Sequence, residues 1–288
     1  MKKGCLVKRK IGIAVLSLFA LAACTSMPGP GDREPMVAAQ DCALREGGSY
    51  QQEGHLYTTL AVAKSAGYDR ARQLTLAYYS QYPDMDKNYD AVYVAVVYLP
   101  VFWEWDWRNS ITGVLHSLHG GSYTEIAARR KGIRAAIVKT VKDPQLDWLT
   151  GLLIHAYGDS FAHTHGEYLS KDEVAYGKWI GHAIPSLLGD NPDDISETKK
   201  RLKYEAYVVE LYKTLRTDEA DDHAFDEFLS YVRDMKRPSD FRPNFSQVAF
   251  PEGQSYASLV AFRQCLSEGA RRLTTREIRR AIDLILQE

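Results

Sequence analysis

The chain has 288 residues, of which 45% are apolar, and a formal net charge of −1 at pH 7. The first 23 residues carry five basic and no acidic side chains, which leaves a charge of −6 on residues 24–288. A chain of this length and composition can bury a substantial core in one domain. The sequence contains no basic stripe, so we expect no duplex nucleic acid among its partners.

The first 23 residues are typical of a bacterial secretory signal. A basic head over Lys2–Lys10 precedes the apolar run Ile11–Ala23, which is too short to span a bilayer comfortably and ends in small residues. The sequence Leu21-Ala22-Ala23-Cys24 resembles the lipobox of bacterial lipoproteins. The resemblance implies cleavage before Cys24 and attachment of lipid to that residue. An ordinary signal peptide with an incidental cysteine is the alternative.

The residue after Cys24 is Thr25 rather than Asp, which by the same analogy favours a lipid anchor in the outer membrane, facing the periplasm. The following segment is rich in Pro, Gly and Met, so we interpret residues 24–41 as a flexible tether before a domain over residues 42–288. Two further cysteines, Cys42 and Cys265, predict a disulfide in an oxidising compartment. Two free buried thiols are the alternative.

The first half of this domain is predicted to be helical, with one exception. A helix is expected over residues 53–65, and Asp69 is expected to cap a second helix that ends before Pro83. Residues 92–107 are β-branched and aromatic, with Pro100 inside the segment. That composition predicts an extended loop or short strands.

The second half is predicted to be mainly helical. Ser122 and Glu125 form a capping box for a helix to about residue 141, and Asp143-Pro144 begins the helix that carries His155. Further helical patterns cover residues 172–188, 196–216, 222–235, 255–270 and 275–287. We find no internal repeat and no second-domain boundary, and we predict a single all-α domain.

Residues 155–165 concentrate side chains that bind metals. On a helix, His155, Asp159 and His163 lie on one side, within about 80° of one another. His165 can join them only if the helix ends near Ala162, so the choice between His163 and His165 is open. A buried aspartate is costly without partners, and imidazole nitrogens beside a carboxylate are ligands that zinc prefers. The segment therefore predicts part of a zinc site.

The spacing of His155, Asp159 and His165 resembles the signature of bacterial zinc-dependent phospholipase C and of the related fungal and plant zinc nucleases. These are all-helical domains that hold three zinc ions and hydrolyse phosphodiesters. The segment Ser80-Gln81-Tyr82-Pro83-Asp84 is similar to that of bacterial relatives in the same superfamily. The resemblance covers roughly residues 53–195, and only its central motif is specific.

The resemblance implies the remaining metal ligands. They are His55, Asp84 (with Asp86 as its competitor), His116 or His119, and His182. Three departures from the family matter. A lipidated Cys24 cannot provide the free N-terminal amino group that holds part of the third zinc, Ser186 stands where a carboxylate should follow His182, and more than thirty residues separate Asp84 from His119. We therefore expect fewer than three zinc ions: a two-metal site, or one tight site and one weak site.

In this interpretation Asp84 and Asp159 bridge or terminate the metals, and Glu167 is the candidate general base. The function implied is a zinc-dependent phosphoesterase, anchored to the bacterial envelope and acting on a small phosphoester or a phospholipid. The alternative is a non-catalytic envelope lipoprotein whose metal site has a structural or interaction role. The aromatic segment 102–107 is interpreted as a packed cluster, with a substrate platform or a membrane-facing lip as alternatives.

Overall fold

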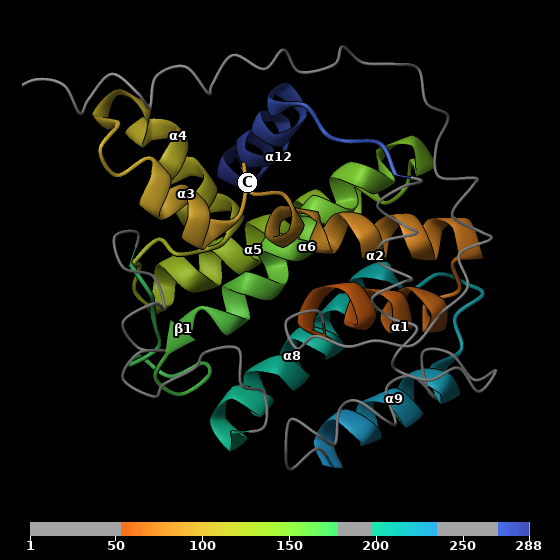
Figure 1. The fold of residues 1–288 in the computed structure, drawn as a ribbon. Helices are drawn as coiled ribbons and strands as arrows, with labels where there is room; N and C mark the ends of the chain where they lie inside the picture. Colours follow the sequence, from red (N-terminus) through yellow and green to blue (C-terminus); the bar gives the residue numbers. More distant parts are fainter. Residues whose placement is uncertain (1–52, 178–196, 235–269, 288) are drawn as a thin grey trace, which may run out of the picture. The chain divides into compact units, whose positions relative to one another are not determined.

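The computed structural model describes residues 53–177, 197–234 and 270–287 (Figure 1). The chain divides into two units, Met1–Glu34 and Pro35–Glu288, and all of the described residues belong to the second. They are mainly helical, with one short antiparallel strand pair, which confirms the helical fold class for this part of the chain.

Several predictions concern residues outside the described ranges. These are the signal peptide, the lipidation at Cys24, the tether, the disulfide between Cys42 and Cys265, the ligand His182 and the helix over 255–270. Within the described ranges, no helix has the length and apolar character needed to cross a membrane.

The elements before residue 120 are helices of three kinds, of which only α2 is long. In chain order they are the π-helix η2 (Glu53–Tyr57), α1 (Thr58–Ser65), α2 (Arg70–Met85), α3 (Ala91–Val97), the 3₁₀ helix η3 (Phe102–Glu104), α4 (Trp105–Ser110) and the π-helix η4 (Ile111–Leu115).

The elements after residue 120 include the longer helices and the strand pair. They are α5 (Tyr123–Thr140), the 3₁₀ helix η5 (Pro144–Leu146), α6 (Asp147–Ala162), β1 (Thr164–His165), β2 (Val174–Ala175), α8 (Thr198–Leu215), α9 (Asp222–Asp234) and α12 (Thr275–Gln287). Thr164 pairs with Ala175 and His165 with Val174 in the antiparallel register.

The predicted helix starts are confirmed where a side chain caps the backbone. Asp69 accepts a hydrogen bond from the backbone N–H of Arg72 at 3.0 Å, and Ser122 with Glu125 forms the capping box of α5. The predicted end of α2 is wrong, because the helix continues through Pro83 to Met85. Tyr82 holds this last turn in place: its hydroxyl accepts from the backbone N–H of Leu273 at 3.1 Å, and this tertiary contact outweighs the local effect of proline.

The prediction of an extended loop or strands over residues 92–107 is also wrong. The segment forms α3, η3 and α4, with Pro100 between the first two. Asp90 caps α3 by accepting from the backbone N–H of Tyr93 at 2.6 Å, and this cap outweighs the weak helix propensity of the valines. Trp107 is buried in the core, but Phe102 and Trp103 are exposed, so the segment is only in part a packed aromatic cluster.

The predicted helix over 172–188 is wrong at its beginning, where the chain forms β2 instead. Glu173 is fully buried and accepts from the Arg130 guanidinium at 2.7 and 3.2 Å and from the Thr164 hydroxyl at 3.0 Å. These inward bonds fix an extended hairpin beside the end of α6. Residues 178–188 lie outside the described ranges.

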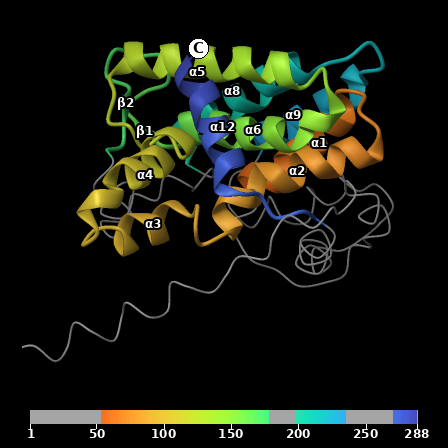
Figure 2. The same cartoon turned by 90° about the horizontal axis from the view of Figure 1, so that it is seen from above.

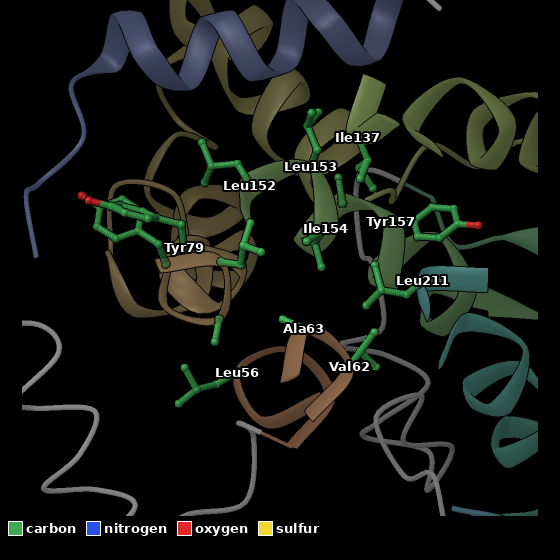
Figure 3. Close-up of a cluster of buried hydrophobic side chains, with 14 of the residues drawn as sticks. Leu56, Val62, Ala63, Tyr79, Ile137, Leu152, Leu153, Ile154, Tyr157 and Leu211 are labelled. Carbon is green, nitrogen blue, oxygen red and sulfur yellow. The ribbon is translucent and has the colours of Figure 1, made fainter. Parts of the chain in front are cut away.

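Helix α6 lies at the centre of this packing (Figure 2). Every residue from Leu149 to Phe161 is buried, and α2, α5, α8, η4 and α12 all contact the helix. Its core-facing side chains meet those of α1, α2, α5 and α8 (Figure 3). A helix that is apolar on all sides is stable only in such an enclosed position. Polar side chains on α6 are therefore placed inside the protein.

Helix α2 approaches α6 closely at Gly151. A Cβ atom at this position would lie 2.6 Å from the Cβ of Tyr79 and 3.0 Å from the carbonyl oxygen of Leu76. Both are firmly held parts of α2, so neither can move aside at low cost. Gly151 therefore sets the distance between the two helices that carry Asp84 and Asp159.

We expect Gly151→Ala to lower the free energy of unfolding by about 1–3 kcal/mol, because the added methyl group forces α2 and α6 apart. The matched control is Gly177→Ala, since a Cβ there would meet nothing within 4 Å. Urea denaturation of both variants measures the difference. A Gly151→Ala protein as stable as the control would contradict the close approach.

Candidate metal centre

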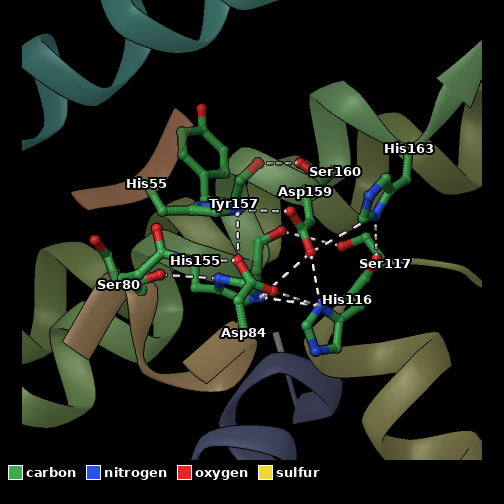
Figure 4. Close-up of polar contacts among 12 residues, drawn as sticks. His55, Ser80, Asp84, His116, Ser117, His155, Tyr157, Asp159, Ser160 and His163 are labelled. Carbon is green, nitrogen blue, oxygen red and sulfur yellow. Dashed lines mark hydrogen bonds and ion pairs between the residues drawn. The ribbon is translucent and has the colours of Figure 1, made fainter. Parts of the chain in front are cut away.

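Five side chains that bind metals converge around the middle of α6 (Figure 4). His155 and Asp159 stand one turn apart on α6, His55 comes from η2, Asp84 from the last turn of α2, and His116 directly follows η4. Two overlapping groups, His55 with His155 and Asp159, and Asp84 with His116 and His155, each bring three ligand atoms within 4.8 Å of one another. These residues could hold a metal ion.

The two oxygens of Asp159 face different histidines. Oδ1 lies 3.0 Å from Nε2 of His55, whereas Oδ2 lies 3.0 Å from Nδ1 of His116 and 3.3 Å from Nε2 of His155. The carboxylate therefore contacts His55 through one oxygen and both His116 and His155 through the other.

Asp84 repeats this division at longer distances. Its Oδ2 lies 3.9 Å from Nε2 of His55, and its Oδ1 lies 3.8 Å from Nδ1 of His116 and 4.0 Å from Nε2 of His155. Each carboxylate thus directs one oxygen to each side. The cluster is continuous, because His155 belongs to both metal-binding groups and its ring packs 4.2 Å from that of His55. We call its His55 end and its His116–His155 end the two half-sites, which share Asp84 and Asp159.

Backbone carbonyls determine which ring nitrogens face the cluster. Nδ1 of His155 donates to the carbonyl of Ser80 at 2.9 Å, and Nε2 of His116 donates to the carbonyl of Tyr89 at 2.8 Å. Because a carbonyl oxygen only accepts, these nitrogens must carry the ring protons. The opposite nitrogens then present lone pairs to the cluster, as in a histidine that is oriented for metal binding.

The inward-facing groups need positive charge between them. Nδ1 of His116 lies 3.1 Å from Nε2 of His155, and both face Asp159, so three groups of acceptor character meet. Either protons or a cation must separate them. The donor set of nitrogens and carboxylate oxygens suits zinc.

The pKa values have the directions that this arrangement requires. Burial alone raises the pKa of Asp159, but the surrounding histidines, His163, His155 and His55 foremost, hold it well below its usual value. Burial lowers the pKa of His116, but its hydrogen bond to Asp159 and the charge of that carboxylate outweigh burial and raise it to about 9. The pKa of His155 is lowered, because the effect of burial outweighs the opposing effect of the Asp159 charge.

His55 differs from the other two histidines because its second nitrogen is not held by a carbonyl. Nδ1 of His55 is buried and has no hydrogen-bond partner among the described residues. Burial lowers the pKa of this ring, but the charge of Asp159 and a hydrogen bond to it reverse the shift and raise the pKa. The raised pKa means that His55 also favours positive charge at its side of the cluster, either its own proton or a cation.

Both π-helices of the described chain present a ligand. His55 lies within η2, and His116 follows the last residue of η4. The next residue, Ser117, has a positive φ of 53°, which is uncommon for a residue other than glycine, and its hydroxyl donates to the carbonyl of Ala156 at 3.0 Å. Wide helical turns and a left-handed residue often mark functional sites, and here they turn His116 toward α6.

Asp84 provides the open side of the cluster. Its side chain is 32% exposed, compared with 4% for Asp159 and 2% for His116. Nε2 of Gln81 donates to Oδ2 of Asp84 at 2.9 Å and holds the carboxylate in place. The competing residue, Asp86, instead accepts from the Tyr82 hydroxyl at 3.0 Å and lies outside both metal-binding groups.

The structure brings His163, rather than His165, to the cluster. Helix α6 ends at Ala162, and Nδ1 of His163 donates to the carbonyl of His116 at 2.7 Å and lies 3.6 Å from Oδ2 of Asp159. Thr164 is held inward by Glu173 and Lys203, and alternation along β1 then turns His165 outward, where its ring meets Tyr176. His165 is exposed and lies outside the metal-binding groups.

Two other expected residues also lie outside the cluster. His119 is half-buried near the start of α5, and its Nδ1 accepts from the backbone N–H of Gly121 at 3.1 Å. The positive φ of Ser117 reverses the chain between His116 and His119, so only the first can reach α6. Glu167 is exposed and lines a surface hollow with residues of α8. It is therefore not placed to act as a general base.

No residue pattern in the sequence marks the groups that orient the ligands. The carbonyls of Ser80 and Tyr89 are backbone atoms, so no residue type marks them. Gln81 stands within the motif that ends at Asp84, but its contact with Asp84 depends on the last turn of α2 continuing past Pro83.

Comparison of this chain with protein-family models, curated proteins and solved structures found no match. The interpretation of the cluster therefore rests on its own residues and their geometry.

We expect His116→Ala to lose most of its bound zinc, because the substitution removes one of two nitrogens from a half-site. His119→Ala is the matched control, since it removes a nearby histidine outside the cluster. Metal analysis of the purified chains measures the difference, and far-ultraviolet circular dichroism checks the helical content. Equal zinc in the two variants would contradict the assignment.

Zinc affinity is expected to rise with pH. With its pKa near 9, metal-free His116 is protonated at pH 7 and must release that proton to bind a metal, whereas Asp159 is already ionised. Release of that proton predicts at least about a tenfold gain in apparent affinity per pH unit below pH 9, and His55, whose pKa is also raised, adds to the gain at lower pH. Competition with a zinc chelator at pH 6, 7 and 8 measures it. An affinity that is constant over this range would be inconsistent with a protonated His116.

Proposed function

We propose that this chain is a zinc-dependent phosphodiesterase whose centre holds two zinc ions. The observation that carries the proposal is the division of both carboxylates, with one oxygen of Asp84 and one of Asp159 on each side of the cluster. An imidazole nitrogen binds only one ion, whereas a carboxylate can bridge two. The arrangement therefore fits two ions better than one.

In the proposed centre His55 would hold one ion and His116 with His155 the other, with Asp84 and Asp159 shared. Zinc held there would lower the pKa of bound water to about 7 and would neutralise charge on the oxygens of a phosphoryl group. The protein supplies orientation: the carbonyls of Ser80 and Tyr89 fix the ring nitrogens, and Gln81 fixes Asp84.

Access to the centre is proposed to be on the side of Asp84. His155 and Asp159 are buried, so a substrate oxygen can approach only where the cluster has an exposed group. The other ligands are largely buried away from water, and the low dielectric constant around them strengthens their electrostatic interactions with a bound cation. No side-chain general base is assigned, because Glu167 lies outside the cluster and the remaining carboxylates are proposed ligands.

The alternative is a metal site that only stabilises the helices. A structural zinc takes four ligands in a closed shell. Five ligand side chains, one of them about one-third exposed, favour the catalytic interpretation. We also propose, from the signal sequence, that the chain is anchored to the bacterial outer membrane through Cys24 and acts on a small phosphoester or a phospholipid.

Hydrolysis of a panel of phosphodiesters, including bis(p-nitrophenyl) phosphate, tests the proposal with and without a zinc chelator. We expect Asp84→Asn to lower kcat/KM by at least about 100-fold, the upper end of the loss caused by changes around a metal centre. Glu167→Gln is the matched control and should retain activity, because Glu167 is exposed outside the cluster. A zinc-loaded protein that hydrolyses none of the panel would favour the structural role.

A further inference from the structure

A large apolar surface lies on and beside α3. Of the large apolar side chains that are exposed in the described part of the chain, seven fall between residues 92 and 103, and the other four are scattered. We call these seven the apolar face: Val92, Tyr93, Val96, Val97, Leu99, Phe102 and Trp103. Phe102 and Trp103 are the most exposed of them, at 70% and 69%. No charged residue occurs from Ala91 to Trp103.

The backbone beneath the apolar face is held in place on several sides. Asp90 caps the start of α3, and Nε of Arg108 donates to the carbonyl of Ala95 at 3.1 Å. Nε1 of Trp105 donates to the carbonyl of Leu99 at 3.2 Å, which ties η3 and α4 to the end of α3. Val94 is buried in the core, so the opposite side of the helix must face outward. The exposure is therefore built into the fold.

We propose that the apolar face docks onto the surface of a lipid bilayer. Exposed aromatic and aliphatic side chains gathered on one helical segment are typical of surfaces that bind at a membrane interface, where Trp and Tyr are favoured. This proposal concerns a different surface from the metal centre, and it does not depend on the proposed hydrolysis.

The N-terminal part of the chain gives a reason to choose a bilayer. Residues 1–52 lie outside the described ranges and contain Cys24, the predicted lipid attachment site. The 28 residues between Cys24 and Glu53 reach at most about 100 Å when fully extended. A chain anchored in this way keeps the domain near the membrane, and the apolar face then determines which side of the domain meets it.

Charge around the apolar face argues against a second copy of the chain as its occupant. Asp90, Glu104 and Asp106 flank the face in sequence, so two copies meeting through it would bring like charges together. The same charges give no attraction to anionic lipids. Docking is therefore expected on zwitterionic bilayers, with little dependence on salt.

Docking would also orient the metal centre. Helix α3 begins two residues after Tyr89, whose carbonyl holds His116, and α3 packs against η4, which ends one residue before that histidine. The half-site at His116 is therefore connected to the docked segment through one short stretch of chain.

Depth-dependent fluorescence quenching tests the proposal on the full chain. The chain is reconstituted with vesicles of dioleoylphosphatidylcholine that contain a lipid brominated in its acyl chains, and the difference between wild type and Trp103→Phe isolates the emission of Trp103. We expect Trp103 to lose much of its emission both in low salt and at 0.5 M salt, where the Debye length is less than about half of its value at 0.1 M. Zinc content is measured in the same samples, so docking and metal binding are judged separately.

Two charge variants make the test specific to the apolar face. Val96→Asp should abolish the quenching of Trp103, because it places a carboxylate in the centre of the face, whereas Leu202→Asp on α8, at 52% exposure in the parent, should not. The proposal is overturned if vesicle-bound chain shows no quenching of Trp103, if the chain fails to bind vesicles, or if Val96→Asp and Leu202→Asp behave alike. A stable dimer that Val96→Asp disrupts, without quenching, would identify a second copy as the occupant.

Discussion

The burial of Asp159 is the constraint on which the metal centre depends. A carboxylate on a helix that is enclosed on all sides is strongly unfavourable without compensating positive charge. Four histidines have a ring nitrogen within 3.6 Å of this carboxylate, and each belongs to a different part of the chain. One lies in η2, one directly follows η4, one lies in α6, and one caps the end of α6. The positions of these elements around α6 are therefore tied to a single charged group.

The same carboxylate, together with Asp84, gives the cluster its internal division. Each directs one oxygen toward His55 and the other toward His116 and His155. The inward lone pairs are fixed by backbone carbonyls, so the site is organised by the main chain of α2 and of the segment before α3 as much as by its ligands. Such preorganisation is what a bridged pair of cations requires.

Much of the site could be predicted from local sequence, but the choice between neighbours could not. Helical periodicity placed His155, Asp159 and His163 on one side, and this is where they lie. The resemblance to the zinc phospholipase C signature favoured His165, which alternation along β1 turns outward once Glu173 and Lys203 hold Thr164 inward. These bonds join residues far apart in the sequence, so no local pattern reveals them. The helical conformation of α3 was missed for a different, local reason, because its β-branched residues obscured the signal of a single capping aspartate, Asp90.

Diffraction from crystals of the zinc-loaded chain, recorded above and below the zinc absorption edge, tests the central claim most directly. The account predicts two anomalous peaks, one beside His55 and one between His116 and His155, each in contact with one oxygen of Asp84 and one of Asp159. A single peak, or zinc bound at His119 or His165 instead, would contradict it.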